Sequence, residues 1–323
     1  MNNAQIDFFT TVKRSTAENL NLAQQISDIL NISINEVYKK MRGESSLSFT
    51  QAMEICKRLN IAFSYQSENT EIIPFVVPKM NSEEDIIFTY LKELEKNLMS
   101  VHTMKKRHIT ITTDDIPLFH ILKYPELAAF KLYFGSNGQS EVNTKFTPSL
   151  VTEEIKTISA HLNHLYLEIP STEIWAKDTV QGTIEQVRYA FEAGYFEDMD
   201  IALSIVAQIR SCLTDIAGYA VKSKKSPDIK NGFNWFCCDV LGSISYLVES
   251  DDTMTCYNRF NTFNYLRTDN LSYCAQTRDW MQSSISKSVS FSGHGEKERN
   301  RFLNNAYREL EKLLMEISSD GKW

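Results

Sequence analysis

The sequence lacks any apolar run long enough to cross a bilayer. The longest segment without Asp, Glu, Lys or Arg is 157–167, eleven residues that include two histidines. A membrane-spanning helix needs about 20 mostly apolar residues. The first residues, Met-Asn-Asn-Ala-Gln-Ile-Asp, also lack the positive charge and apolar segment of a secretion signal. We therefore expect no membrane partner and a cytoplasmic location.

Proline, glycine and cysteine are also scarce. Seven prolines and eleven glycines in 323 residues exclude a collagen-like or low-complexity chain. A hydrophobic content of 42% is enough to build a folded core. The six cysteines are widely scattered and contain no C-x-x-C spacing for zinc or redox chemistry. We expect a reducing compartment, with the adjacent Cys237 and Cys238 as small buried residues.

Negative charge is in excess over the whole chain but not in its first part. The net charge is −7, whereas residues 1–60 hold seven basic and six acidic side chains and so carry +1. The remaining residues then carry −8. A near-neutral N-terminal part on an acidic body is the pattern expected if only the N-terminal part meets an anion.

The first sixty residues are predicted to form short helices. Ser33 is placed to cap a helix, Gly43 to end it, and Ser48 with Gln51 to form the capping box of the next one. Apolar residues recur at helical spacing in each segment. The expected helices cover 5–16, 21–30, 34–42 and a segment that opens at 49.

Residues 22–43 fit the pattern of a helix-turn-helix. Two helices that cross steeply through a three-residue turn need a small residue at the crossing, here Ser27. The turn needs a residue that tolerates a left-handed backbone, here Asn31, and the second helix needs a buried apolar residue, here Val37. These positions are all occupied by suitable residue types.

The same residues resemble a known family, the lambda-repressor-like (Cro/C1-type) helix-turn-helix domain. The resemblance lies in Leu22–Ser33, in Arg42-Gly43-Glu44, in Leu47-Ser48-Phe49 and in Leu59-Asn60-Ile61. The departure is Asn31, where glycine is commoner in the family. The resemblance covers about a fifth of the chain and implies a domain of four to five helices over residues 1–65.

The family likeness implies that the helix 34–42 enters the major groove of double-stranded DNA. Asn can bond an adenine edge, Lys or Arg a guanine, and Glu can accept from cytosine. Polar residues near helix starts would hold phosphates. The implied base-facing residues are Asn35, Glu36, Tyr38, Lys39 and Arg42, and the implied phosphate contacts are Gln24 and Ser33.

A competing interpretation treats this charged face as merely solvated. A net charge of +1 is low for a DNA-binding domain, because affinity from counterion release grows with the number of phosphates neutralised. Small helical domains of this kind also bind proteins or peptides. A protein- or peptide-binding module without DNA binding is therefore the alternative function.

Residues 66–112 are predicted to be a connector. Residues 72–77 form a β-branched run interrupted by proline, expected as an edge strand that pairs with 109–112. The helix 82–102 should be capped by Ser82. Its apolar residues follow the 4-3-4-3 spacing of a short coiled coil. They form a stripe of Ile87, Leu91, Leu94, Leu98 and Val101. This stripe either pairs two copies in a homodimer or packs against its own chain.

Residues 113–323 are predicted to be a mostly helical regulatory domain. Period-two alternation within 233–257 favours a small antiparallel sheet. The expected fold class is therefore mainly α, with the helix-turn-helix domain followed by a larger α+β body. The whole chain also loosely resembles uncharacterised bacterial transcription regulators, in stretches similar to 115–117, 125–131, 173–175, 287–288 and 296–300.

Few residues in the body suggest chemistry. His161 and His164, one turn apart, could share a metal with Glu168, but a polar helix face is the preferred interpretation. No G-x-S-x-G, P-loop or G-x-G-x-x-G pattern is present, so we expect neither an enzyme nor a cofactor. One aromatic set either lines a ligand pocket or, as we prefer, packs in the core: Trp175, Phe233, Trp235, Tyr246 and Tyr257.

Three classes of function remain open at this point. The chain is a transcription regulator whose body senses a small-molecule or peptide signal, an interaction protein, or an enzyme whose groups meet only in the fold. DNA selection with gel shifts would separate the first two classes. A deep pocket with several converging, perturbed acids or histidines would revive the third.

Overall fold

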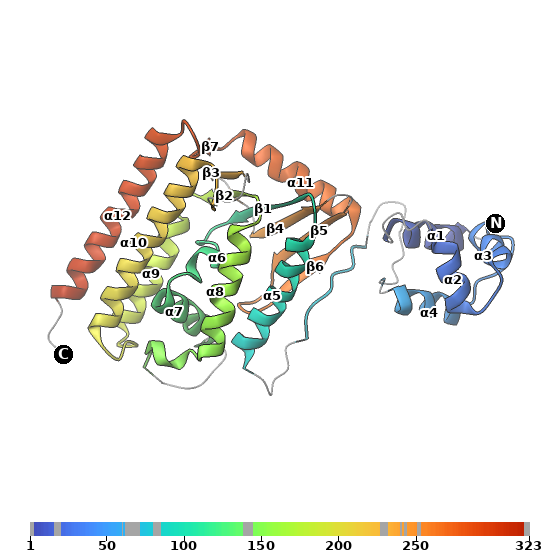
Figure 1. The fold of residues 1–323 in the computed structure, drawn as a ribbon, viewed down its shortest axis with the longest axis horizontal. Coiled ribbons are helices and arrows are strands. Elements are labelled where there is room, and N and C mark those ends of the chain that lie inside the picture. The colour runs from blue at the N-terminus through green and yellow to red at the C-terminus, as the bar shows by residue number, and fades with distance from the viewer. Residues whose placement is uncertain are drawn as a thin grey trace.

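The computed structural model describes residues 3–15, 21–59, 61, 72–79, 85–137, 145–226, 232–239, 241, 244–250 and 253–319. These residues contain twelve α-helices and a sheet of seven strands. The helices of the N-terminal part are drawn in blue in Figure 1, and those of the body run from cyan to red.

Four helices form the N-terminal part, which we call the head: α1 (Asn3–Ser15), α2 (Leu22–Leu30), α3 (Ile34–Met41) and α4 (Phe49–Leu59). Five apolar side chains from these helices make a small core of their own: Phe9, Val12, Ile26, Val37 and Ile55. The predicted helices are confirmed to within one or two residues. So is the capping box, in which the backbone N–H of Gln51 donates to Ser48 Oγ and that of Ser48 to Gln51 Oε1.

The body is built on one mixed sheet in the order β6-β5-β4-β1-β2-β3-β7. Its centre is parallel: β1 pairs with β2, and β2 with β3. The remaining pairs are antiparallel. The strands are β1 (Arg107–Thr113), β2 (Ser171–Ala176), β3 (Phe233–Cys238), β4 (Ser245–Ser250), β5 (Thr253–Arg259), β6 (Tyr265–Thr268) and β7 (Val289–Ser290).

The predicted fold class is therefore wrong in its sheet. The alternation in 233–257 identified real strands, but β3 does not pair with β4, because β1 and β2 lie between them. Every residue of β2 is buried, and a strand buried on both faces shows no alternation that a sequence search can find. The segment 72–77 was also misplaced, since Val76 bridges Arg267 of β6 and not β1.

Helices cover both faces of the sheet (Figure 1). One face, through Ile174, Leu247 and Cys256, packs against α11 (Leu271–Ser286). The other face, through Ile109, Trp175 and similar residues, packs against the rest of the body. The helices in this part of the body are α5 (Ile86–Thr103), α6 (Leu118–Ile121), α7 (Pro125–Asn137), α8 (Glu153–Leu167), α9 (Thr179–Glu192), α10 (Met199–Lys222) and α12 (Glu296–Ser319). A 3-10 turn covers Pro148–Leu150.

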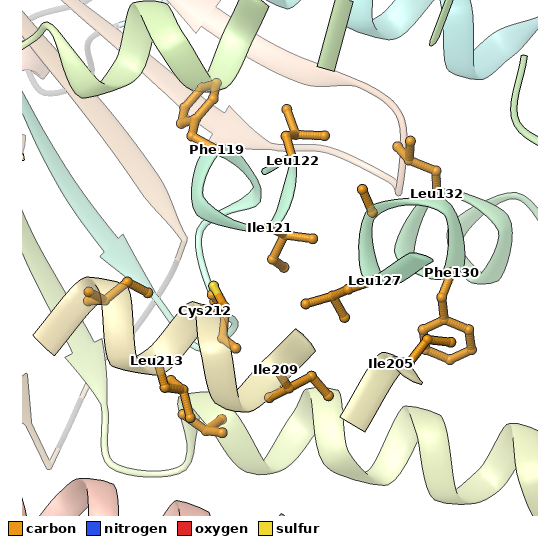
Figure 2. Close-up of a cluster of buried hydrophobic side chains, with 14 of the residues drawn as sticks. Phe119, Ile121, Leu122, Leu127, Phe130, Leu132, Ile205, Ile209, Cys212 and Leu213 are labelled. Carbon is orange, nitrogen blue, oxygen red and sulfur yellow. The ribbon is translucent and has the colours of Figure 1, made fainter. Parts of the chain in front are cut away.

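The centre of the larger core lies where α6 and α7 meet α10. Figure 2 shows Ile121 and Leu127 facing Ile209 and Cys212 across this junction. All four side chains are fully buried. α10 also has the length and composition of a membrane-spanning helix, as core helices often do, and here Arg210 forms an ion pair with Glu311 of α12.

The apolar stripe on α5 packs against its own chain, the second of the two arrangements considered. Leu91, Leu98 and Val101 are buried in the core, and Ile87 and Leu94 pack against it. Within one chain the stripe is therefore covered by the body's own core, while Ile87 and Leu94 remain partly exposed. The helix is capped by Asp85, whose carboxylate accepts from the N–H groups of Ile87 and Phe88, and the predicted cap, Ser82, lies outside the described residues.

Gly295, between β7 and α12, allows a close approach of two backbone segments. A Cβ added there would lie 2.0 Å from the carbonyl oxygen of Ser290. Nearby, the buried Arg299 donates to the carbonyl oxygen of Phe291 at 2.6 Å and so ties α12 to the same loop. No side chain fits at this position without moving the backbone.

We expect Gly295→Ala to lower the free energy of unfolding by about 1–3 kcal/mol, because the added methyl group forces such a shift. The matched control is Gly218→Ala, inside α10, where an added Cβ meets nothing within 4 Å. Relief of the helical glycine penalty should raise stability there by up to about 1 kcal/mol. Urea unfolding of both variants checks the pair, and effects of the same sign would contradict this account of Gly295.

Candidate functional site

The turn between α2 and α3 is held by backbone and hydroxyl groups. Asn31 adopts the left-handed conformation, with φ of 53° and ψ of 47°. The buried Ser27 hydroxyl donates to the carbonyl oxygen of Ile32 at 2.5 Å. The N–H of Ile32 in turn donates to the carbonyl oxygen of Ser27 at 3.2 Å. The residues predicted for the turn therefore have the expected geometry, including the fully buried Val37.

A second contact, not found from the sequence, holds the loop after α3. The buried Gln5 amide of α1 donates to the carbonyl oxygens of Lys40 and Ser45, at 2.7 and 2.8 Å. Its side-chain oxygen accepts from the N–H of Leu47 at 2.8 Å. Gln5 thus fixes α3 from its C-terminal side. A buried polar residue on an amphipathic helix leaves no periodic signal that would reveal this role.

Three predicted site residues lie together on the exposed face of α3. Asn35, Tyr38 and Lys39 are all exposed, and Tyr38 is 47% accessible. Residues three and four apart share one helix face. No side-chain hydrogen bond or ion pair engages any of the three within the described part of the chain. This face is therefore free to contact a partner.

Three other predicted residues are already engaged by the head itself. Glu36 accepts a hydrogen bond from the Ser45 hydroxyl at 2.7 Å. The Ser33 hydroxyl accepts from the N–H of Glu36 at 3.3 Å and so caps α3. Gln24 donates to Asp28 at 2.8 Å on the surface of α2. A contact from any of the three to a partner would have to compete with, or add to, these bonds.

Arg42, the seventh predicted residue, is bound by a neighbouring carboxylate. Its Nε and Nη2 donate to the two oxygens of Glu44 at 2.7 and 2.9 Å, so the pair is bidentate. Donation from Arg42 holds the pKa of Glu44 below its usual value. Both side chains are more than half exposed, so the pair can open toward an anion at little cost.

A buried polar network in the body was not found from the sequence. Glu173, in the middle of β2, is fully buried. One of its oxygens contacts His120 Nε2 at 2.7 Å and accepts from the Tyr166 hydroxyl at 2.5 Å. The other accepts from Trp175 Nε1 at 2.8 Å. Burial raises the pKa of Glu173, but His120, Tyr166 and the charge of Lys225 outweigh it, so the pKa lies below the usual value.

Lys225 completes the network next to Tyr166. Its Nζ donates to the Ser171 hydroxyl at 2.8 Å and lies 3.4 Å from the centre of the Tyr166 ring. Burial lowers the pKa of Lys225 to about 7, although Glu173 acts in the opposite direction. Since Glu173, His120 and Lys225 are all buried, a solute would reach them only if the body opened. The network is therefore built as a structural element.

The histidines predicted as possible metal ligands point to different carboxylates. His161 Nδ1 lies 2.8 Å from Glu95 of α5, whereas His164 lies 3.5 Å from Glu168. His102 of α5 contacts Glu168 as well, at 2.5 Å. Among the described residues, no group of three or more Cys, His, Asp or Glu is arranged to hold a metal ion. The His161–Glu95 and His102–Glu168 pairs join α5 to α8, whereas His164 and Glu168 lie one turn apart at the end of α8.

The predicted aromatic set divides between core and cavity. Trp175, Phe233 and Trp235 are fully buried in the core, as preferred. Tyr246 and Tyr257 instead line a cavity of about 200 Å³ in the body.

Comparison of the chain with family models, with curated proteins and with solved structures finds no match. The exposed face of α3 and this cavity are thus the two candidate sites.

We expect Glu173→Gln to lower the free energy of unfolding by about 3–5 kcal/mol, because it breaks a fully buried network and removes the negative charge that faces His120 and Lys225. The control is Glu316→Gln, which breaks an exposed ion pair with Arg188 and should cost less than about 1 kcal/mol. Urea unfolding near pH 7 compares the two variants. Equal costs would show that the buried carboxylate has no special role.

The lysine of this network should make stability depend on pH. Its pKa is about 7 in the folded chain, against an ordinary value of 10.5, so between these values the unfolded chain binds more protons and stability rises with pH. Lys225→Met removes this contribution. Unfolding free energies at pH 7, 8 and 9 should show the wild type gaining on the variant as the pH rises. Parallel curves would contradict the assignment.

Proposed function

We propose that this chain is a DNA-binding transcription regulator whose head contacts double-stranded DNA through α3. The observation that carries the proposal is the free, exposed set of Asn35, Tyr38 and Lys39 on one face of that helix. The turn geometry at Ser27 and Asn31 supports it, because it is the geometry that a helix-turn-helix requires.

The residue types on this face suit the edges of bases. An Asn amide can bond both N6 and N7 of adenine, and a Lys ammonium can reach O6 and N7 of guanine. Asn35 and Lys39 lie one helical turn apart, so both can enter one stretch of major groove. Tyr38 between them offers a ring for a thymine methyl group and a hydroxyl for a phosphate.

The charge of the head predicts the character of its binding. With a net charge of +1 over residues 1–60, and Arg42 paired to Glu44, the head neutralises few phosphates. Binding to arbitrary DNA should therefore be weak and only mildly dependent on salt. Discrimination must come from base contacts and from the use of more than one head on one site.

One observation favours the second candidate, a protein- or peptide-binding head. Phe49 and Met53 lie one turn apart on α4 and are 71% and 43% exposed. Exposed apolar side chains grouped in this way are typical of protein contacts. A head that uses this surface would leave the polar face of α3 unused.

Base contacts by α3 can be tested on a site obtained by selection from random-sequence DNA. Asn35→Ala and Lys39→Ala should each weaken binding to that site by about 1–3 kcal/mol. On unrelated DNA, Asn35→Ala should lose much less affinity than on the selected site, since the amide carries no charge. Lys57→Ala, an exposed lysine on α4, is the matched control and should leave site preference unchanged.

The same assay distinguishes the two candidate functions. Failure of the intact protein to enrich any sequence, or unchanged binding by Asn35→Ala and Lys39→Ala, would reject α3 as a reading helix. If Phe49→Ser with Met53→Ser abolished capture of a protein partner while α3 variants did not, the interaction module would replace the regulator.

Substitutions of Arg42 and of Glu44 should change DNA affinity in opposite directions. Glu44→Gln should release Arg42 for a phosphate, tighten binding to unrelated DNA and steepen the salt dependence by about one charge. Arg42→Gln should do the reverse. The double variant decides whether Arg42 is responsible. If it is, adding Glu44→Gln to the Arg42→Gln variant should change DNA affinity very little. Equal tightening in both backgrounds would exclude Arg42 as a phosphate contact.

A further inference from the structure

The body contains a cavity that has no role in the proposed DNA contact. It has a volume of about 200 Å³ and lies between α5, the segment that follows β1, and strands β4 to β6. Figure 1 shows α5 beside these strands. Its walls are mostly apolar, with side chains that include Leu94, Leu98, Ile109, Ile116, Val248 and Phe263.

Four tyrosines line this apolar interior: Tyr90, Tyr246, Tyr257 and Tyr265. The Tyr265 hydroxyl accepts from Asn97 Nδ2 at 2.6 Å. Within the described part of the chain, the hydroxyls of the other three have no hydrogen-bond partner. Burial raises the pKa of Tyr90 and that of Tyr257 to about 12, so these phenols stay neutral near pH 7 and act as O–H donors.

The ammonium group in the cavity wall is, by contrast, fully used. Lys131 Nζ donates to Asp115 Oδ2, Gln186 Oε1 and Thr183 Oγ1 at 2.6, 2.7 and 3.3 Å. An ammonium has three N–H donors, so none is left for a ligand. Asp115 Oδ1 likewise accepts from Thr183 Oγ1 at 2.7 Å and from the N–H of Ile116 at 2.9 Å.

The amide of Asn258 is also satisfied. Its oxygen accepts from the Ser245 hydroxyl at 2.7 Å, and its nitrogen donates to the Tyr273 hydroxyl at 2.9 Å. Charge and hydrogen-bonding capacity are therefore committed along the wall formed by the ends of β1 and β5. Among the described residues of the lining, the tyrosine hydroxyls, the amide oxygen of Asn97, the hydroxyl of Thr262 and one cation remain.

That cation is Arg259, at the end of β5. It lines the cavity and also a shallow outer depression that contains Phe75 and Asp114. The described part of the chain shows no ion pair for Arg259, and Asp114 is not within ion-pair distance. The guanidinium is exposed and stands where the apolar interior meets solvent.

The one charged group left unused in the described lining is thus a guanidinium at the mouth, and phenol hydroxyls able to donate a hydrogen bond lie inside. A hydrocarbon would leave them unpaired, and an amine would meet a like charge. A cavity of about 150 Å³ lined by apolar side chains can hold a benzene molecule. A cavity slightly larger than that, with donors added, matches one ring or a short chain that ends in an acceptor.

We propose that this cavity binds a small carboxylic acid, with one ring or a short hydrocarbon chain in the apolar interior and its carboxylate at Arg259 and the tyrosine hydroxyls. Arg259 supplies the charge-assisted contact, and the leucine and isoleucine walls supply the apolar burial. The use of this acid as a signal that alters DNA binding rests on the proposed function. The binding itself does not.

Calorimetric titration of the intact protein with phenylacetate and with octanoate tests the site without DNA. We expect at least one acid to bind, and its uncharged counterpart, 2-phenylethanol or 1-octanol, to bind at least tenfold more weakly. The cation 2-phenylethylamine should not bind. Absence of binding by both acids at millimolar concentration, or equal binding by the amine or the alcohols, would overturn the proposal.

Variants locate the bound acid. Arg259→Gln, at an exposed position, should weaken binding at least tenfold, and Tyr246→Phe should weaken it several-fold by deleting one donor without changing the ring. Arg301→Gln, on the exposed surface of α12, is the matched control and should bind like the wild type. Unchanged affinity in both Arg259→Gln and Tyr246→Phe would place the acid elsewhere and reject this site.

A gel shift with and without the acid separates the two proposals. A change in DNA affinity that Arg259→Gln abolishes supports the signal role. Acid binding without any effect on DNA affinity rejects the signal role and leaves the site. Acid binding by a protein that selects no DNA rejects the proposed function alone.

Discussion

The buried carboxylate of Glu173 is the interaction on which the arrangement of the body depends. It stands in the middle of β2, the strand buried on both faces, and bonds to side chains from three directions. His120 comes from α6, Tyr166 from α8, and Trp175 from the same strand. A carboxylate in such a place is costly unless every oxygen is paired. Each helix must therefore hold its position for the charge to remain stable.

The need to pair buried polar groups distinguishes the networks around Glu173 and Asp115 from the cavity beside them. Around Glu173, and around Asp115 with Lys131, donors and acceptors match and the groups are used up. In the cavity beside them, the hydroxyls of Tyr90, Tyr246 and Tyr257 and the guanidinium of Arg259 have no hydrogen-bond or ion-pair partner among the described residues. Matched groups hold a fold together, whereas polar groups without partners are what a ligand can satisfy.

In the head, the position of α3 is controlled from both of its ends. Ser27 and Asn31 fix the turn that leads into it, and Gln5 holds the loop that leaves it. These contacts use backbone groups, so the side chains on the outer face of α3 are not needed for folding. That is why Asn35, Tyr38 and Lys39 are available to a partner while Val37 is not.

The sequence by itself determined the local features of this protein. The head helices, the left-handed Asn31, the Ser33 cap and the capping box at Ser48 all follow from residues within one or two turns of each other. The existence of strands within 233–257 also follows from nearby residues, because alternation is a property of neighbouring residues.

Only the tertiary structure decided which strands pair and which polar groups meet. β1, β2 and β3 are joined by crossovers of many residues, and no local pattern encodes such a pairing. β2 was missed because a strand buried on both faces shows no alternation. Glu173 with Lys225, and Arg259 with Tyr90, are far apart in sequence, so a shared network or a shared cavity appears only once the sheet has brought them together.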